Sequence, residues 1–395
     1  MLRGGTPAAL AAASLLAVGG ACVRPLPAPP RLFPVSTTWV APVGEALEGP
    51  LATDGTRIFA GGRGGAVVAL DRVTGTVAWR VEEGPGPVSA AGATLVHRQA
   101  DGMVSSLDPA SGSVRWRSPS GIEGGLPALV DGDRVIVVGQ GAAALELSSG
   151  RVLWSVPGPP KATSPAVAFG SRVFVGEEDG TLRCRDRASG ASLWTYKTAE
   201  ALLASPLVDD ERRVFLGATD RGFVSLDPKG GQRWRWKLGV DVQHPPALYR
   251  DTVLFAAHDD VLYALRRKSG HLAWKTSLPS RPLSGPILVG TAVLVACYES
   301  DVAGFDAETG KVLGAVRTPS GLRTPPIVIG DRLYAGLRDR TVVALYLGDP
   351  QALPPPSPSP SPSAPQASPA VPASPAPPFP SPAPVPSASP RGRIP

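Results

Sequence analysis

The sequence predicts an all-β protein built from a repeated unit of about 40 residues, and three observations predict it. The 395 residues include 45 glycines and 46 prolines, which would interrupt helices every few residues. A pattern of Leu-Asp, Gly and Trp, first seen as Leu70-Asp71, Gly75 and Trp79, recurs through most of the chain. A ladder of prolines recurs at the same interval. Regular recurrence of this kind indicates an array of similar β-units.

The first residues have the plan of an export signal. Arg3 is followed by an apolar stretch from Ala8 to Val18 and then by Gly19-Gly20-Ala21-Cys22. An apolar stretch this short cannot span a bilayer, which needs about 20 residues. We expect residues 1–21 to be a signal peptide and residues 22–35 a linker. Cys22 resembles the cysteine of a bacterial lipobox, which receives lipid, although Gly19 stands where such boxes usually carry Leu; an ordinary secretory signal is the alternative.

The repeated turn predicts the outer part of each unit. In the pattern Asp-x-x-x-Gly, the Asp side chain can cap backbone amides, and the Gly can adopt a positive φ. The strand that follows this turn carries the Trp. Glu146 and Arg266 replace the Asp in the third and sixth copies, and the turn of the fifth copy is one residue shorter. The turn glycines stand 37 to 40 residues apart: Gly75, Gly112, Gly150, Gly190, Gly230, Gly270 and Gly310.

The prolines predict eight inner strands, because Pro suits the first residue of a strand. The last unit stops at Gly348 without a Gly-x-x-x-Trp strand, whereas Trp39 stands 40 residues before Trp79. We therefore expect the N-terminal strand to complete the last unit and close a ring of eight four-stranded blades over residues 36–348, which leaves no exposed sheet edge to the array. The prolines are Pro50, Pro87, Pro127, Pro165, Pro206, Pro246, Pro286 and Pro326.

These repeats resemble the pyrroloquinoline-quinone-like (PQQ-like) repeat family. The copy from Val68 to Trp79 matches its strand, Leu-Asp, Gly and aliphatic-x-Trp pattern closely, and the copy from Phe305 to Leu313 matches up to a Gly314 in place of Trp. The resemblance implies an eight-bladed β-propeller in which each repeated Trp packs between neighbouring blades. The tryptophans given this structural role are Trp39, Trp79, Trp116, Trp154, Trp194, Trp234 and Trp274.

The family includes quinoprotein dehydrogenases, which need a catalytic Asp, acidic Ca²⁺ ligands and, in many members, adjacent cysteines. The three cysteines here are not adjacent, and no insertion large enough to build a pocket interrupts the repeats. The Asp of the repeated turn recurs in blade after blade, which favours a structural cap. We expect no catalytic residue, no cofactor and no metal ligand.

Charge gives two weaker indications. The net charge is +6 and no block of five basic residues occurs, so nucleic-acid binding is not predicted. Basic residues gather in the fourth to sixth units, as a solvated face or as a docking surface for an acidic partner. Four side chains precede inner strands and could ring one mouth of the channel as a ligand or peptide site, or be unrelated solvated groups: Lys161, His244, Arg281 and Arg323.

The C-terminal segment, residues 349–395, differs in composition from the rest. It holds 19 of the 46 prolines, from Pro350 to Pro395, mixed with Ser and Ala. Such sequence favours an extended, disordered tail.

Together these features predict a monomeric, non-catalytic propeller of the cell envelope. Within its family the chain is closest in type to BamB-like lipoproteins of outer-membrane assembly. That likeness implies a lipid anchor in the outer membrane facing the periplasm, and an envelope protein partner such as a barrel assembly protein. The alternatives are an envelope sensor or binding module for a small ligand or glycan, and a PQQ-dependent dehydrogenase.

Overall fold

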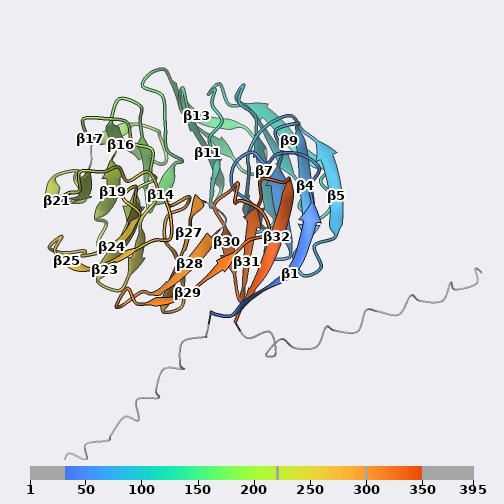
Figure 1. Cartoon of the computed structure of the whole chain (residues 1–395). Helices are drawn as coiled ribbons and strands as arrows, with labels where there is room; N and C mark the ends of the chain where they lie inside the picture. Colours follow the sequence, from blue (N-terminus) through green and yellow to red (C-terminus); the bar gives the residue numbers. More distant parts are fainter. Residues whose placement is uncertain (1–31, 219–221, 299–300, 349–395) are drawn as a thin grey trace, which may run out of the picture. The chain divides into compact units, whose positions relative to one another are not determined.

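The computed structural model describes residues 32–218, 222–298 and 301–348. These residues form eight antiparallel four-stranded sheets and no helix. The sheets are arranged around a ring as the blades of a β-propeller (Figure 1), which confirms the predicted fold. The expected signal peptide, the lipidation site Cys22 and the Pro-rich tail lie outside the described residues.

Blades 1 to 4 follow one another along the chain, each from its inner to its outer strand. Blade 1 consists of β2 (Ala52–Thr53), β3 (Arg57–Gly61), β4 (Ala66–Asp71) and β5 (Val77–Glu82). Blade 2 consists of β6 (Val88–Ala91), β7 (Thr94–Arg98), β8 (Met103–Leu107) and β9 (Val114–Pro119). Blade 3 consists of β10 (Leu129–Asp131), β11 (Arg134–Gly139), β12 (Gly141–Glu146) and β13 (Val152–Pro157). Blade 4 consists of β14 (Val167–Phe169), β15 (Arg172–Gly176), β16 (Thr181–Asp186) and β17 (Ser192–Lys197).

Blades 5 to 7 repeat the plan, and blade 8 takes its outer strand from the N-terminal end. Blade 5 consists of β18 (Leu207–Val208), β19 (Val214–Ala218), β20 (Gly222–Leu226) and β21 (Gln232–Lys237). Blade 6 consists of β22 (Ala247–Tyr249), β23 (Thr252–Ala257), β24 (Val261–Arg266) and β25 (Leu272–Ser277). Blade 7 consists of β26 (Ile287–Val289), β27 (Ala292–Ala296), β28 (Asp301–Asp306) and β29 (Val312–Arg317). Blade 8 consists of β30 (Ile327–Ile329), β31 (Arg332–Gly336), β32 (Thr341–Leu347) and β1 (Val35–Pro42).

The ring closes as the repeat register predicts. Strand β1 pairs antiparallel with β32, from Val35 opposite Leu347 to Pro42 opposite Thr341. Trp39 faces Ala344 in this ladder, just as Trp79 faces Ala69 in blade 1. The N-terminal strand therefore supplies the outer strand that the eighth unit lacks.

A β-bulge orients each repeated tryptophan towards the next blade. In blade 1, Trp79 faces Ala69 but Val77 faces the next residue, Leu70, so one residue of β5 is unpaired. Such a bulge redirects the side chain beside it. The Trp79 ring lies against Gly112 of blade 2, and its indole Nε1 donates a hydrogen bond to the Pro109 carbonyl at 2.9 Å. The same glycine contact and hydrogen bond recur for Trp116, Trp154, Trp194 and Trp234. Trp274 lies against Gly310 in the same way, but its indole Nε1 is buried without a hydrogen-bond partner among the described residues.

Blade 7 departs from this pattern. Gly314 faces Gly304 at the position where the other blades carry Trp. The ring of Phe33, from the segment expected to be a linker, fills the space: a Cβ added to Gly314 would lie 2.7 Å from Phe33 Cγ. An aromatic side chain from outside the repeats thus replaces the missing Trp.

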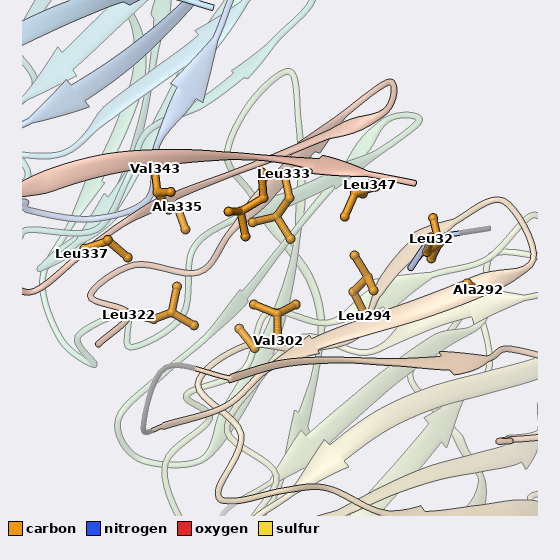
Figure 2. Packing of buried hydrophobic residues seen from close by; sticks show 12 residues of the cluster. Leu32, Ala292, Leu294, Val302, Leu322, Leu333, Ala335, Leu337, Val343 and Leu347 are labelled. Atoms are coloured by element: carbon orange, nitrogen blue, oxygen red, sulfur yellow. The ribbon is translucent and has the colours of Figure 1, made fainter. Parts of the chain in front are cut away.

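The core consists of eight hydrophobic clusters rather than one central core, and most lie between neighbouring blades. Figure 2 shows the cluster between blades 7 and 8, where Leu294 of β27 and Leu333 of β31 face one another and Leu32 packs beside Leu347. Each residue of this cluster is buried. Burial spread around the ring in this way makes each blade depend on its neighbours for stability.

The alternating strand directions give the propeller two faces. One carries the connections between blades and the turns between each second and third strand, such as Glu177–Gly180; we call it the inter-blade face. The other carries the turns between first and second strands and the repeated Asp-x-x-x-Gly turns, such as Asp71–Gly75; we call it the Asp-turn face. On the Asp-turn face the Asp71 carboxylate accepts hydrogen bonds from the amides of Val73 and Thr74, as expected for a structural cap.

Candidate functional site

All four residues predicted to ring a channel mouth lie in connections between blades, on the inter-blade face. Lys161 precedes β14 of blade 4, His244 precedes β22 of blade 6, Arg281 precedes β26 of blade 7, and Arg323 precedes β30 of blade 8. The lysine and both arginines are exposed, and His244 is half-buried.

Arg281 lines a polar recess at blades 6 and 7, and His244 lies beside this recess. The recess has a volume of about 300 Å³, and Asp241, His258 and Arg281 contribute to its lining. The amide of His258, in the turn between β23 and β24, donates to the carbonyl of Asp241, in the connection between blades 5 and 6, at 3.0 Å. The ring of His244 lies beside that of His258, with centroids 6.0 Å apart. The Nε2 of His244 is 3.1 Å from the Pro282 carbonyl, which can only accept, so this nitrogen carries the proton.

Both of these histidines are held neutral by their surroundings. Burial lowers the pKa of His244 below its ordinary 6.5, and the hydrogen bond to Pro282 only partly offsets this. Burial also lowers the pKa of His258, and the positive charge of Arg281 lowers it further, against the opposing effects of Asp241 and Asp260. At neutral pH the recess therefore presents one cation, one carboxylate and the uncharged imidazole of His258, a set suited to a polar or charged group of a partner.

The other two predicted residues stand apart from this recess. Arg323 lines a second recess of about 170 Å³, between blades 8 and 1, together with Glu48 and Thr324. The backbone of Lys161 pairs with Glu178 of its own blade, since the Lys161 amide donates to the Glu178 carboxylate at 3.0 Å. The structure thus brings His244 and Arg281 together, places Arg323 one blade further, and leaves Lys161 two blades away.

Two arginines of this face were missed from the sequence. Arg338 and Arg340, in the turn between β31 and β32, are exposed, as are Arg281 and Arg323. Within the described residues none of the four forms an ion pair with a carboxylate. We call these four residues the arginine patch of blades 7 and 8. Neither Arg338 nor Arg340 precedes an inner strand, and the turn of a single blade gives no repeated signal in the sequence.

The basic residues of blades 4 to 6 are engaged to a large extent by structural contacts. Arg213 is buried and its guanidinium is 2.7 Å from the buried Asp209 carboxylate. Arg267 of blade 6 reaches Asp210 of blade 5 at 2.5 Å, and Arg187 of blade 4 reaches Asp131 of blade 3 at 2.6 Å. Arg187 and Arg267 thus join neighbouring blades, and Arg213 is paired within blade 5, so these three basic residues of blades 4 to 6 already have structural partners.

The donor set does not suit a quinone–calcium site. Among residues 32–218, 222–298 and 301–348, no three His, Cys, Asp or Glu side chains are grouped so as to hold a metal ion. Cys184 and Cys297 are both buried, in blades 4 and 7, and burial raises the pKa of Cys184 to about 11. No helix in the described part of the chain is long and apolar enough to cross a membrane.

The fold and this face define an eight-bladed β-propeller of PQQ-like repeats with a polar, arginine-rich inter-blade face. The family model described as outer membrane protein assembly factor BamB matches residues 36–157 and 141–349. The chain therefore belongs to that family.

Relatives at the sequence level are distant. The outer membrane protein assembly factor BamB of Legionella pneumophila (strain Paris) is 28% identical over 170 residues, 40% of this chain and 44% of that protein. A tetrathionate hydrolase of Acidithiobacillus ferrooxidans is 26% identical over 175 residues, 38% of this chain and 35% of that protein. The chain thus matches less than half the length of each.

Similar solved structures cover more of the chain. The crystal structure of BamB from Moraxella catarrhalis has a TM-score of 0.68 and 20% identity, and covers 79% of this chain and 99% of that one. Quinohemoprotein alcohol dehydrogenase from Comamonas testosteroni has a TM-score of 0.63 and 14% identity, over 81% of this chain and 78% of that one. At these identities the likeness establishes the fold alone.

Proposed function

We propose that this chain is a non-catalytic propeller of the cell envelope that binds a protein partner of outer-membrane assembly, a barrel assembly protein, through its inter-blade face. Membership of the family described as outer membrane protein assembly factor BamB supports a role in outer-membrane assembly. A lipid anchor at Cys22, on the outer membrane facing the periplasm, would keep the propeller near such a partner.

The arginine patch of blades 7 and 8 is the observation that favours the inter-blade face as the binding surface. Its four guanidinium groups are exposed and, within the described residues, lack carboxylate partners. Arginine forms bidentate hydrogen bonds with carboxylates and is enriched at protein interfaces. The adjoining recess adds Asp241 and the neutral His258 as hydrogen-bonding groups. An acidic segment of the partner fits this surface.

Affinity purification from detergent-solubilised envelope tests the proposal. The tagged full-length chain is expected to recover an outer-membrane barrel protein, identified by mass spectrometry. The double charge reversal Arg281→Glu and Arg323→Glu should reduce that recovery by about tenfold or more, because like charges would then face the partner. Higher salt should weaken the wild-type complex.

Lys268→Glu provides the matched control, because Lys268 is exposed on the Asp-turn face of blade 6. It changes the net charge in the same direction on the opposite face, and recovery should stay at the wild-type level. Failure to recover a barrel protein, or equal recovery by the double variant, would rule out this role of the inter-blade face.

We also expect this protein to have no enzymatic activity. The similar tetrathionate hydrolase and the dehydrogenase of similar fold make two assays appropriate: tetrathionate consumption, and dye reduction with alcohols after addition of quinone and Ca²⁺. We expect no activity in either, and reproducible turnover that depends on a side chain of this protein would contradict the proposal.

A further inference from the structure

Arginine side chains bridge three of the eight junctions between blades on the Asp-turn face in the same way. In blades 3, 4 and 8 the first residue of the second strand is Arg, and its guanidinium donates to a carbonyl in the Asp-x-x-x-Gly turn of the following blade. These bridges run from Arg134 to Arg187 O at 3.0 Å, from Arg172 to Pro228 O, and from Arg332 to Val73 O at 3.2 Å. At two of these junctions the arginine and the Trp donate to the same carbonyl: Arg134 and Trp154 to Arg187 O, and Arg172 and Trp194 to Pro228 O.

Blade 2 has no such bridge, as is also true of the described residues of blades 1, 5, 6 and 7. Thr94 is the first residue of β7, where blades 3, 4 and 8 have Arg. Val96, opposite Ser106, stands where blades 1 and 4 have Phe59 and Phe174, whose rings pack against the Trp of their own blade at 5.8 and 5.9 Å. Trp116 is therefore covered neither by an aromatic ring nor by an arginine.

These smaller residues leave a cleft of about 360 Å³ between blades 2 and 3. Blade 2 contributes Thr94, Ser106, Arg115 and Trp116 to its lining, and blade 3 contributes Asp133 and Glu146. The volume lies in the range of about 300–1,000 Å³ that small-molecule sites occupy. The cleft opens on the Asp-turn face, away from the arginine patch and its recess.

The charges of the cleft are already paired. Arg115 is 2.7 Å from the Asp108 carboxylate and also donates to the Ala93 carbonyl, while Glu146 is 3.1 Å from Arg151. The indole Nε1 of Trp116 donates to the Leu147 carbonyl at 2.9 Å, so the indole offers its ring rather than its N–H. A charged ligand would have to displace these ion pairs, whereas a neutral one would not.

We infer that this cleft binds a neutral saccharide. A pyranose ring has an apolar face that suits an indole and Leu147, and hydroxyl groups that can donate to carboxylates and accept from guanidinium and hydroxyl groups. Arg115, Glu146 and Thr94 supply such groups around the aromatic surface. The inference goes beyond the proposed protein partner, because it concerns the opposite face and a different class of ligand.

Binding is measured with the purified full-length chain against an array of neutral glycans, followed by calorimetric titration of the neutral disaccharides that bind. At least one neutral saccharide should bind the wild type. Thr94→Arg should weaken that affinity by about tenfold or more, equivalent to about 1.4 kcal/mol, because the new side chain occupies the cleft as Arg134 occupies the next junction. The melting temperature of this variant should not fall, which separates loss of the site from loss of the fold.

Thr76→Arg is the matched control. Thr76 is exposed beside the Asp-x-x-x-Gly turn of blade 1, so the variant adds the same charge to the same face outside the cleft. Its saccharide affinity should equal that of the wild type. The inference is overturned if no neutral glycan binds, if Thr94→Arg binds as tightly as the wild type, or if only charged glycans bind. Loss of the barrel protein in the capture experiment leaves these outcomes unaffected.

Discussion

Each tryptophan of the ladder packs against a glycine of the next blade, and this pair of residues is the smallest unit of the ring. Gly190 has φ of +74°, and a Cβ at this position would lie 2.5 Å from Cε3 of Trp154. Two demands therefore select glycine: a backbone conformation that L-residues rarely adopt and a flat surface for the indole. Trp154 in turn is buried and donates to the Arg187 carbonyl at 3.0 Å.

Substitution of Gly190 should show how much the positive φ and the contact with the Trp154 indole each contribute to stability. Gly190→Ala is expected to lower the free energy of unfolding by about 2–5 kcal/mol, from left-handed strain together with overpacking against Trp154. Gly170→Ala in the same blade is the control, because Gly170 has φ of +60° but nothing within 4 Å of its Cβ position. It should cost only about 1–2 kcal/mol. Equal losses in chemical denaturation would mean that the indole contact contributes nothing.

The buried histidines predict a loss of stability in mild acid. Burial lowers the pKa of His97 below its ordinary 6.5, and the nearby Glu83 carboxylate offsets this only in part. Below about pH 6.5 the unfolded chain therefore binds a proton that the folded chain resists, so stability present above that pH is lost as pH falls towards the folded pKa. The slope is at most about 1.4 kcal/mol per pH unit for each such histidine.

His97→Phe tests this contribution, since Phe255 occupies the corresponding position in blade 6. The denaturation free energy of the variant should depend less on pH between about 6.5 and 4.5 than that of the wild type. His271→Phe, at an exposed position, is the control for the effect of the substitution itself. An unaltered profile in His97→Phe would assign the acid sensitivity to other groups.

At the scale of elements, the departure from the repeat lies at blade 7. Phe33 fills the place of the missing Trp beside Gly314, and Leu32 is buried against the same cluster. The residues just before β1 therefore complete blade 7 with their side chains, while β1 completes blade 8 with its backbone.

A double-mutant cycle measures this replacement. Phe33→Ala should lower the free energy of unfolding by about 2 kcal/mol through lost burial. Gly314→Trp alone should also destabilise, because its Cβ would lie 2.7 Å from Phe33 Cγ. The two changes together should cost less than their sum, since the indole can then occupy the vacated space. Additive losses would show that the two positions do not share one site.

The elements were predictable to very different degrees. The repeat register predicted the blade count and the inner strands because the proline recurs eight times and the turn glycine seven times. It predicted the pairing of β1 with β32 because Trp39 stands in register with the repeated Trp. Phe33 was not predictable, because it lies outside the repeat and its role depends on a contact with Gly314 that is distant in sequence. Arg338 and Arg340 were not predictable either, because they lie in a turn whose sequence does not recur in the other blades.

At the scale of the whole molecule, stability depends on closure of the ring. The clusters that form the core include residues of neighbouring blades, and blades 8 and 1 share one such cluster, with Tyr334 of β31 against Val68 of β4. The Tyr334 hydroxyl also donates to the Arg72 carbonyl at 3.2 Å. Loss of the outer strand of blade 8 would expose the edge of β32 and weaken both junctions.

A pair of truncations tests closure. A chain that starts at Val43 lacks β1 and should unfold at a clearly lower temperature and aggregate through the free edge of β32. A chain that starts at Leu32 keeps every contact of β1 and Phe33 given above and should melt at the wild-type temperature. Similar melting of both truncations in calorimetry would mean that blade 8 is stable with three strands.

The pairing of Val35 with Leu347 also has a mechanical consequence. The ladder between β1 and β32 begins at these two residues, so both described ends of the propeller join it at the same point. Tension applied between residues 32 and 348 would act at one end of the β1–β32 pairing and break its hydrogen bonds one after another. Thermal stability depends on all of the junctions between blades, whereas mechanical stability would depend on the pairing of β1 with β32 alone. A single-molecule stretching experiment should therefore record separation of these two strands at low force before the blades unfold.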